Sequence, residues 1–413
     1  MKRIFSGGRV GLGALILIVL LGLAQAGTAA AQGPLADSFM PVIVRGADVP
    51  ILQGAPTASL WVYAYRSGAL WQIPYQIDHV VAGAYSADPA TTLGPADEIV
   101  FMAADMGTLA TPAQIVATLP ISSSWYQIEV TDSLSPTQKA YVYVVQSSVL
   151  TPTTTAGYVS FDAQAKRIQA SAYTLGLLAG HPGFDYLALN GSGVDILDRT
   201  KIRISAMGGL LTQTEDNLPE PAVDVRANGP VRAIIQGGGT IAYRSMVQTV
   251  LAQSLLGVNS VRLSTDFSQL ATGSTFYNAS VGQGVTVDGN PDAVSLSPPS
   301  PWWQLSGGTG TLVQVMDASQ VGGTQSTYYK DDANVDLGDT GDQKSYGDVG
   351  IMVHSPHVSV VYRQALVVLP PSMPNVGLIV AAGADPTRLG ITATLQTAPP
   401  SYQYRIYLPI LMR

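Results

Sequence analysis

The 413-residue chain is long enough for two domains, and its composition excludes several classes of protein. Only 12% of its residues are charged, about half the usual share of roughly 25%, and the net charge of -7 argues against nucleic acid as a partner. The chain has no cysteine, which excludes disulfides, thiolate metal sites and cysteine nucleophiles.

Residues 1–31 have the organisation of a secretory signal peptide. Met1–Arg3 supplies a positive start, Val10–Leu23 is a nearly unbroken apolar segment, and Ala29–Ala31 offers the small side chains that signal peptidase requires. The apolar segment is short for a spanning helix, which needs about 20 residues, although an uncleaved membrane anchor is the alternative. We therefore expect a protein without a membrane span, beginning near Gln32, that is secreted or attached to the cell surface.

Residues 32–150 are expected to form a compact N-terminal β domain. Its segments are rich in β-branched and aromatic residues and are interrupted by glycine and proline, as strands are. A turn at Arg66–Ala69 predicts a hairpin between two of them. The expected strands are Phe39–Arg45, Ser59–Tyr65, Leu70–Ile77, Trp125–Val130 and Ala140–Gln146.

Residues 158–398 continue the strand pattern beyond a short polar linker, Thr151–Gly157. Many strands with few helical stretches between them predict stacked antiparallel sheets. Ser245–Leu256 also fits a helical period, although we prefer a strand pair there. The predicted fold class is all-β, with a small N-terminal β domain followed by a large antiparallel β-sandwich. The expected strands include Lys201–Ser205, Val231–Ile235, Val261–Phe267, Gly310–Met316, Val349–His354, Val358–Leu369 and Gly390–Leu395.

The carboxylates of this charge-poor chain crowd most closely in Lys330–Asp348, which has the composition of a long loop. Asp332, Asn334 and Asp336 alternate like the oxygen ligands of calcium loops, and Asp339 follows them. The segment therefore predicts a possible calcium site formed by these four side chains.

This spacing departs from the helix-loop-helix calcium motif. Leu337 intervenes before Gly338, and Gln343 stands where the motif has a bidentate glutamate. A looser calcium loop and a solvated cluster of acidic turn residues both remain open.

Two Tyr-Arg pairs, Tyr243-Arg244 and Tyr362-Arg363, end apolar runs in the second region, and His354 follows the acidic stretch. A lyase acting on uronic acids needs a cation that neutralises the sugar carboxylate and a tyrosine, histidine or lysine that removes the α-proton. These five residues are the candidate catalytic set. Alternatively, the pairs are chance neighbours on sheets, because adjacent strand residues face opposite sides.

Trp302 and Trp303 are candidates for substrate binding. Aromatic faces can stack on the apolar faces of sugar rings, so the two residues could form a platform for carbohydrate. Tryptophan is equally a core residue of β-sandwiches.

Three short motifs carry a resemblance to a known type of protein: Asn228–Arg232, Asp97–Phe101 and Asp105–Gly107. Their order resembles exported bacterial all-β proteins with a small N-terminal barrel and a large sandwich, as in rhamnogalacturonan-lyase-like and mutarotase-like proteins. The resemblance implies that architecture and a role connected with glycans. The tail, residues 399–413, is similar to short ends of some exported bacterial proteins, which implies sorting or attachment, with a final edge strand as the alternative.

The leading hypothesis is an exported protein that binds or degrades extracellular polysaccharide, with calcium as a possible cofactor. If it is an enzyme, we expect a polysaccharide lyase or a related carbohydrate-active enzyme. The alternative is a non-catalytic structural protein of the cell envelope or surface. A depolymerase predicts that the acidic loop, His354 and the Tyr-Arg pairs converge on one cleft, whereas a structural protein predicts that they are scattered.

Overall fold

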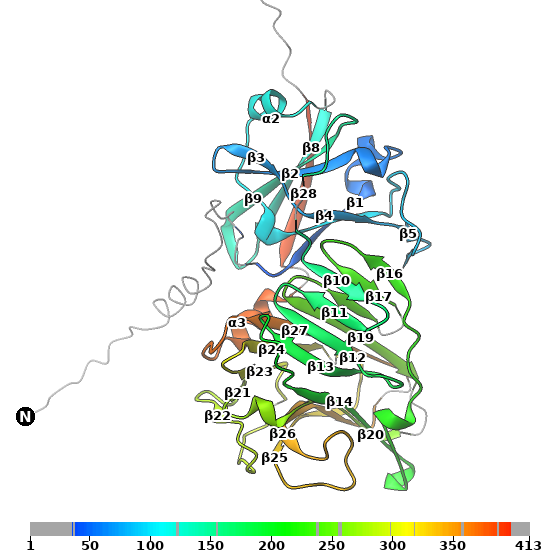
Figure 1. Ribbon diagram of the computed structural model, residues 1–413, viewed down its shortest axis with the longest axis vertical. Coiled ribbons are helices and arrows are strands. Elements are labelled where there is room, and N and C mark those ends of the chain that lie inside the picture. Colours follow the sequence, from blue (N-terminus) through cyan, green and yellow to red (C-terminus); the bar gives the residue numbers. More distant parts are fainter. Residues whose placement is uncertain are drawn as a thin grey trace, which may run out of the picture.

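The computed structural model describes residues 35, 38–120, 124–153, 156–236, 239–254, 258–297, 299–317, 319–356, 359–385 and 388–397 (Figure 1). The expected signal peptide, residues 1–31, and the expected tail, residues 399–413, lie outside this part of the chain. Within it, no helix has the length and apolar character needed to cross a membrane. The fold is all-β, with antiparallel sheets throughout, as the sequence predicts.

The N-terminal unit packs a five-stranded sheet against a three-stranded one. Inward-facing side chains alternate along strands such as β8, and they fill a core shared by both sheets. The five-stranded sheet has the order β28 (Leu389–Thr397), β8 (Ser124–Asp132), β9 (Ser135–Gln146), β2 (Leu60–Arg66), β3 (Ala69–Gln72). The three-stranded sheet is β1 (Pro41–Arg45), β7 (Glu98–Met102), β4 (Tyr75–Asp78), accompanied by the hairpin β5 (Val80–Val81) and β6 (Ala84–Tyr85) and by helix α2 (Pro112–Thr118).

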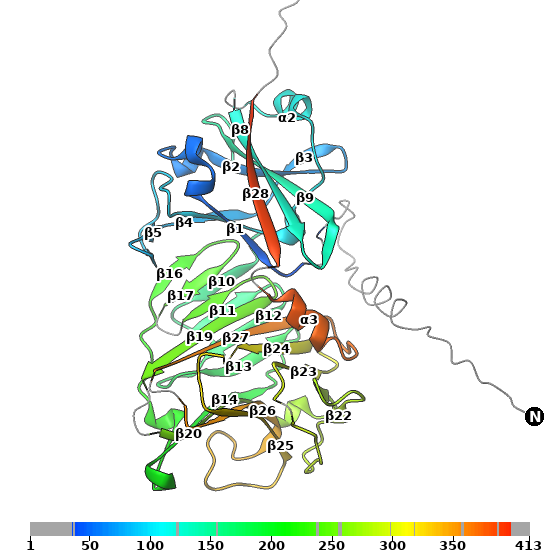
Figure 2. The ribbon, with the colours of Figure 1, turned by 180° about the vertical axis from the view of Figure 1, so that it is seen from behind.

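The structure places strand β28 in a different unit from the one that the sequence predicts. The segment was expected to close the second β region, but it returns to the N-terminal unit and pairs with β8 from Leu389↔Asp132 to Thr397↔Ser124. Figure 2 shows it, in red, against β8. Arg388 fixes the register, because its Nε donates to Asp132 Oδ1 at 2.6 Å. The N-terminal unit is therefore completed by the end of the described chain.

The larger unit is a sandwich with a nine-stranded sheet as one layer. Strands β10 to β14 follow one another along the opposite layer in Figure 1, so that the four- and five-stranded sheets lie side by side. The nine-stranded order is β16 (Val225–Asn228), β17 (Ala233–Ile235), β18 (Thr240–Ala242), β19 (Met246–Ser254), β27 (Ser359–Leu369), β24 (Thr311–Asp317), β23 (Trp302–Ser306), β21 (Thr275–Asn278), β22 (Val285–Thr286).

The opposite layer completes the sandwich and encloses its apolar core. Its four-stranded sheet is β10 (Val159–Asp162), β11 (Arg167–Ala170), β12 (Tyr173–Leu177), β13 (Phe184–Leu189). Its five-stranded sheet is β15 (Leu211–Thr214), β14 (Leu197–Ala206), β20 (Val258–Phe267), β26 (Ser345–His354), β25 (Thr324–Asp332). The segment that also fitted a helical period is strand β19, which pairs with β27 from Met246↔Val367 onwards.

The two units meet through a shared apolar cluster. The N-terminal unit contributes residues of β1, β7 and the segment before β1, and the sandwich contributes residues of β19, β24, β27 and helix α3 (Gly377–Gly383). Burial of these side chains from water favours a fixed contact between the units. The buried members are Met40, Val100, Met102, Val231, Tyr243, Met246, Val313, Val367, Val376 and Val380.

Candidate functional site

The acidic stretch is a β-hairpin with a long loop. Its ends lie in strands β25 and β26, which pair through Lys330↔Asp348 and Asp332↔Ser345. Residues 333–344 connect the strands, so the loop leads into the strand that carries His354, as the sequence indicates.

Asp339 ties this loop to the five-stranded sheet. Lys201 Nζ donates to Asp339 Oδ2 at 2.6 Å, and Arg203 Nη2 donates to Asp339 Oδ1. Burial opposes ionisation of Asp339, but these two cations outweigh it and lower its pKa to about 2. Gly341 then passes so close to Asp198 that a Cβ would lie 2.0 Å from its Oδ2. The loop is therefore anchored onto the sheet by a charged side chain and a glycine.

A buried group of charges lies beneath the anchored loop. Lys201 is completely buried and forms an ion pair with Asp266, which is also completely buried. Burial, together with repulsion from the buried Asp348, raises the pKa of Asp266 well above its usual range. Lys201 thus lies as a buried cation between a carboxylate of β20 and one of the loop.

The other proposed calcium ligands are exposed or half-buried. Asp332 Oδ1 accepts hydrogen bonds from both the backbone N and the Nδ2 of Asn334, at 2.9 and 2.8 Å. Asp336 lies 3.6 Å from Lys330 Nζ. Among the described residues, no three or more carboxylate or histidine side chains group closely enough to hold a metal ion. The calcium site that the spacing of Asp332, Asn334 and Asp336 predicts is not tested by these contacts, although they engage three of its four side chains with other protein groups.

The five candidate catalytic residues lie apart from one another. Tyr243 is buried where the two units meet, and Arg244 stacks over the ring of Tyr158, 5.2 Å from its centroid. His354 is exposed at the end of β26. Tyr362 points into the sandwich, whereas Arg363 is exposed on the other face of β27, 3.8 Å from Asp317. The structure does not bring a tyrosine, an arginine and His354 to one cleft.

Both candidate stacking residues are buried in strand β23. Trp302 is 3% exposed and Trp303 is 0% exposed, so neither offers an open ring face. Trp303 packs edge-on against Phe267, with 5.9 Å between ring centroids. Trp302 lies so close to Gly377 of helix α3 that a Cβ there would be 2.0 Å from its ring. The structure therefore uses both residues as core.

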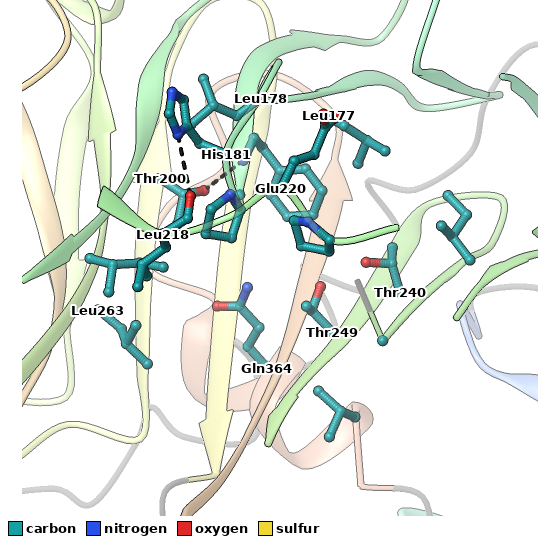
Figure 3. Close-up of a pocket in the computed structure, with 18 of the residues that line it drawn as sticks. Leu177, Leu178, His181, Thr200, Leu218, Glu220, Thr240, Thr249, Leu263 and Gln364 are labelled. Carbon is teal, nitrogen blue, oxygen red and sulfur yellow. Dashed lines mark hydrogen bonds between the residues drawn. The ribbon is translucent and has the colours of Figure 1, made fainter. Parts of the chain in front are cut away.

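A pocket of about 500 Å³ opens between the two layers of the sandwich (Figure 3). One side is formed by β14 and β20, and the other by β17, β18, β19, β24 and β27. Pockets of this volume accommodate small molecules. Its upper walls are largely apolar and come from the adjacent ends of β12 and β13, the connection between them and the segment after Asn217, including Leu177, Leu178, Phe184, Leu218 and Val223.

The floor of the pocket is polar and uncharged. Gln314 Nε2 donates to Gln364 Oε1 at 2.6 Å and contacts the Tyr362 hydroxyl at 3.3 Å. Thr265 Oγ1 donates to Gln314 Oε1 at 3.3 Å. Thr249, which is directly opposite Gln364 in the β19–β27 ladder, has a buried hydroxyl without a hydrogen-bond partner in the described part of the chain. Figure 3 shows Thr249 and Gln364 beside each other.

Burial raises the pKa of Tyr362, so its hydroxyl remains protonated and can donate a hydrogen bond. The two glutamines can both donate and accept. Together with Thr249 and Thr265, these groups suit a ligand that carries hydroxyl or amide groups. They provide no obvious nucleophile or base.

The ionisable side chains that line the pocket mouth are His181 and Glu220. His181 Nδ1 lies 3.4 Å from the carbonyl oxygen of Leu218, and Glu220 pairs with Lys166. The segment from Leu218 to Val223 contains two prolines and crosses the rim, where Figure 3 labels Leu218 and Glu220. A short segment thus borders the mouth. The ion pair between Glu220 and Lys166 attaches this segment to the turn before β11.

Sequence reasoning named Tyr362 but missed the rest of this floor. Gln314 and Gln364 occupy inward positions of strands whose other inward residues, such as Leu312 and Leu366, are apolar. A polar residue at an inward position of a core strand is the signal that could have found them.

The resemblance motifs lie at the contact between the units. Glu98 pairs with Arg232, and Asp105 accepts from the Tyr158 hydroxyl at 2.8 Å. No family model matches the chain, and no curated protein is similar to it. The all-β sandwich architecture is the part of the expected resemblance that the structure supports.

Proposed function

We propose that the chain is an exported, non-catalytic glycan-binding protein that takes a sugar residue into the pocket between the sandwich layers. The observation that carries this proposal is the uncharged polar floor of Gln314, Gln364, Thr249 and Tyr362 beneath apolar walls. Sugars present hydroxyls in some directions and apolar C–H faces in others. A pocket with both kinds of surface complements them.

Binding is favoured over cleavage because the candidate lyase groups do not assemble. Tyr362 reaches the pocket, but Arg363 is on the opposite face of its strand, and no arginine or lysine is among the described residues that line the pocket. Proton abstraction beside a uronate needs a cation at the sugar carboxylate. We therefore expect glycans to be bound without the unsaturated products of a lyase.

The alternative function, a structural protein of the cell envelope or surface, is favoured by the scatter of His354, Arg363 and Tyr243. Under that alternative the pocket would have no glycan ligand. The same experiment separates the two functions.

The test is a panel of neutral and acidic glycans, measured by calorimetry and thermal shift on protein that begins at Gln32. We expect at least one neutral glycan to bind. Gln364→Leu and Thr249→Val should each weaken that binding by about tenfold, the equivalent of one hydrogen bond. Gln248→Leu is the matched control, because Gln248 neighbours Thr249 in β19 and so faces the other side of the sheet.

No glycan bound across the panel would overturn the proposal and leave the structural alternative. Equal binding by Gln364→Leu, Thr249→Val and the native protein would place any glycan elsewhere. Unsaturated uronide absorbance that grows with time would show that the protein is a lyase after all.

A further inference from the structure

The pocket combines three properties that together restrict the chemistry of its ligand: a floor without charge, walls that are largely apolar and a closed deep end. Each can be followed from the residues that line it (Figure 3).

The deep part of the pocket disfavours anionic sugars. Its floor consists of amides and hydroxyls, and Lys166, beside the mouth, is already paired with Glu220. A uronate carboxylate placed on this floor would lose its hydration without gaining an opposite charge, which is unfavourable. Glu220 at the mouth adds repulsion. An uncharged ligand is therefore favoured.

The walls disfavour a ring that carries hydroxyls on every side. Leu177, Leu178, Phe184, Leu218 and Val223 offer no side-chain hydrogen bond, and Leu263 adds to this surface from β20. A hydroxyl pressed against them would lose its bonds to water without replacement. A methyl or acetyl group in the same position would instead be removed from water favourably.

The deep end of the pocket is closed. Gln314 and Tyr362 are 3% and 4% exposed, so a polymer cannot pass out beyond them. A glycan would have to enter by one end, with its terminal residue on the floor and the following residues at the mouth beside His181 and Glu220.

From these properties we infer that the pocket is specific for the uncharged end of a glycan chain whose terminal sugar carries an apolar substituent, such as a methyl or N-acetyl group. This inference rests on the proposed glycan-binding function. It adds the class of ligand and the direction of its entry.

The test compares matched sugars by calorimetry on the native protein. N-acetylglucosamine should bind more tightly than glucose, and D-rhamnose more tightly than D-mannose, of which it is the 6-deoxy form, each by at least about threefold, as one buried methyl group gives. Glucuronate should bind more weakly than glucose.

A substitution in the apolar wall of the pocket tests whether this wall causes the preference for sugars with an apolar substituent. Leu177→Asn should bring the affinities for N-acetylglucosamine and glucose together, while the control Leu395→Asn, on the exposed strand β28, should leave their ratio unchanged. Glucose or glucuronate binding as tightly as the substituted sugars would overturn the inference but leave glycan binding intact. Absence of binding by every sugar and every glycan of the panel would overturn the proposed function itself.

Discussion

Arg232, which is buried, and Glu98, which is partly buried, form an ion pair across the contact between the two units. Arg232 Nη2 donates to Glu98 Oε2 at 2.6 Å, and Arg232 Nε donates to Asp78 Oδ2 at 2.7 Å. The Arg232 side chain is completely buried. Gln76 completes the arrangement, because its Oε1 accepts from the backbone N of Val231 and of Arg232. The strands β4 and β7 are thereby fastened to the start of β17 by charge-assisted bonds.

Arg232→Met should lower the free energy of unfolding by about 3–5 kcal/mol. The change removes the cation that Asp78 and Glu98 share but leaves both carboxylates in place. Removing one partner of a buried ion pair is strongly destabilising, because the remaining charge is then buried without compensation. Urea denaturation measures the loss. Arg363→Met is the control, since Arg363 is exposed and 3.8 Å from its partner Asp317. Equal stability of the two variants would show that the contact between the units does not depend on Arg232.

Two aspartates of the acidic loop should differ sharply in their contribution to stability. Asp339→Asn removes the partner shared by Lys201 and Arg203, and we expect a loss of about 3 kcal/mol. Asp336→Asn should stay within about 0.5 kcal/mol, because Asp336 is exposed and 3.6 Å from Lys330. Chemical denaturation of both variants at neutral pH makes the comparison. A small effect of Asp339→Asn would mean that the loop is not anchored through this residue.

Asp198 should make the protein less stable as the pH rises. Burial, followed by repulsion from Asp342, raises its pKa to about 6. The folded state then holds the proton more tightly than the unfolded chain, whose pKa is about 3.9, so the contribution of Asp198 to stability is fully present below about pH 4 and is lost as the pH rises to about 6. The fall attributable to this group is up to about 3 kcal/mol.

Asp198→Asn tests this assignment, because an asparagine Oδ1 can still accept from the backbone N of Asp342. Relative to the native protein, the variant should become more stable as the pH rises through the window from about 4 to about 6. Asp339 does not confuse the comparison, since its pKa of about 2 keeps it ionised across that window. Parallel stability curves for the two proteins would contradict the raised pKa.

Local pattern was sufficient to predict many of the strands, because buried and exposed residues alternate along them, but none of the strands β10 to β13 was predicted from it. Strands β1 and β8 follow this alternation, whereas β2 is buried along most of its length. The partner of β28 could not be predicted in this way. Its register depends on Arg388 and Asp132, which are separated by 256 positions, and an exposed edge strand carries little pattern of its own.

The candidate site was less predictable than the fold. Its floor takes Thr249, Gln314 and Gln364 from three different strands, and only the sheet order brings them together. The residues that the sequence predicts as functional are mostly charged or aromatic. Their contacts give them structural roles: Asp339 anchors a loop, and Trp303 packs against Phe267. Neutral polar residues at inward positions form the pocket floor.

Calcium should leave the thermal midpoint of the folded protein unchanged. The ion needs six to eight oxygen ligands, and the loop's best-placed carboxylate, Asp339, is occupied by Lys201 and Arg203. Asp332 accepts from Asn334, and Asp336 faces Lys330. Thermal melting with saturating calcium and with a chelator tests this, because an ion that binds the folded state must raise the midpoint. A calcium-dependent rise that Asp332→Asn abolishes would establish the calcium loop that the spacing of Asp332, Asn334 and Asp336 predicts.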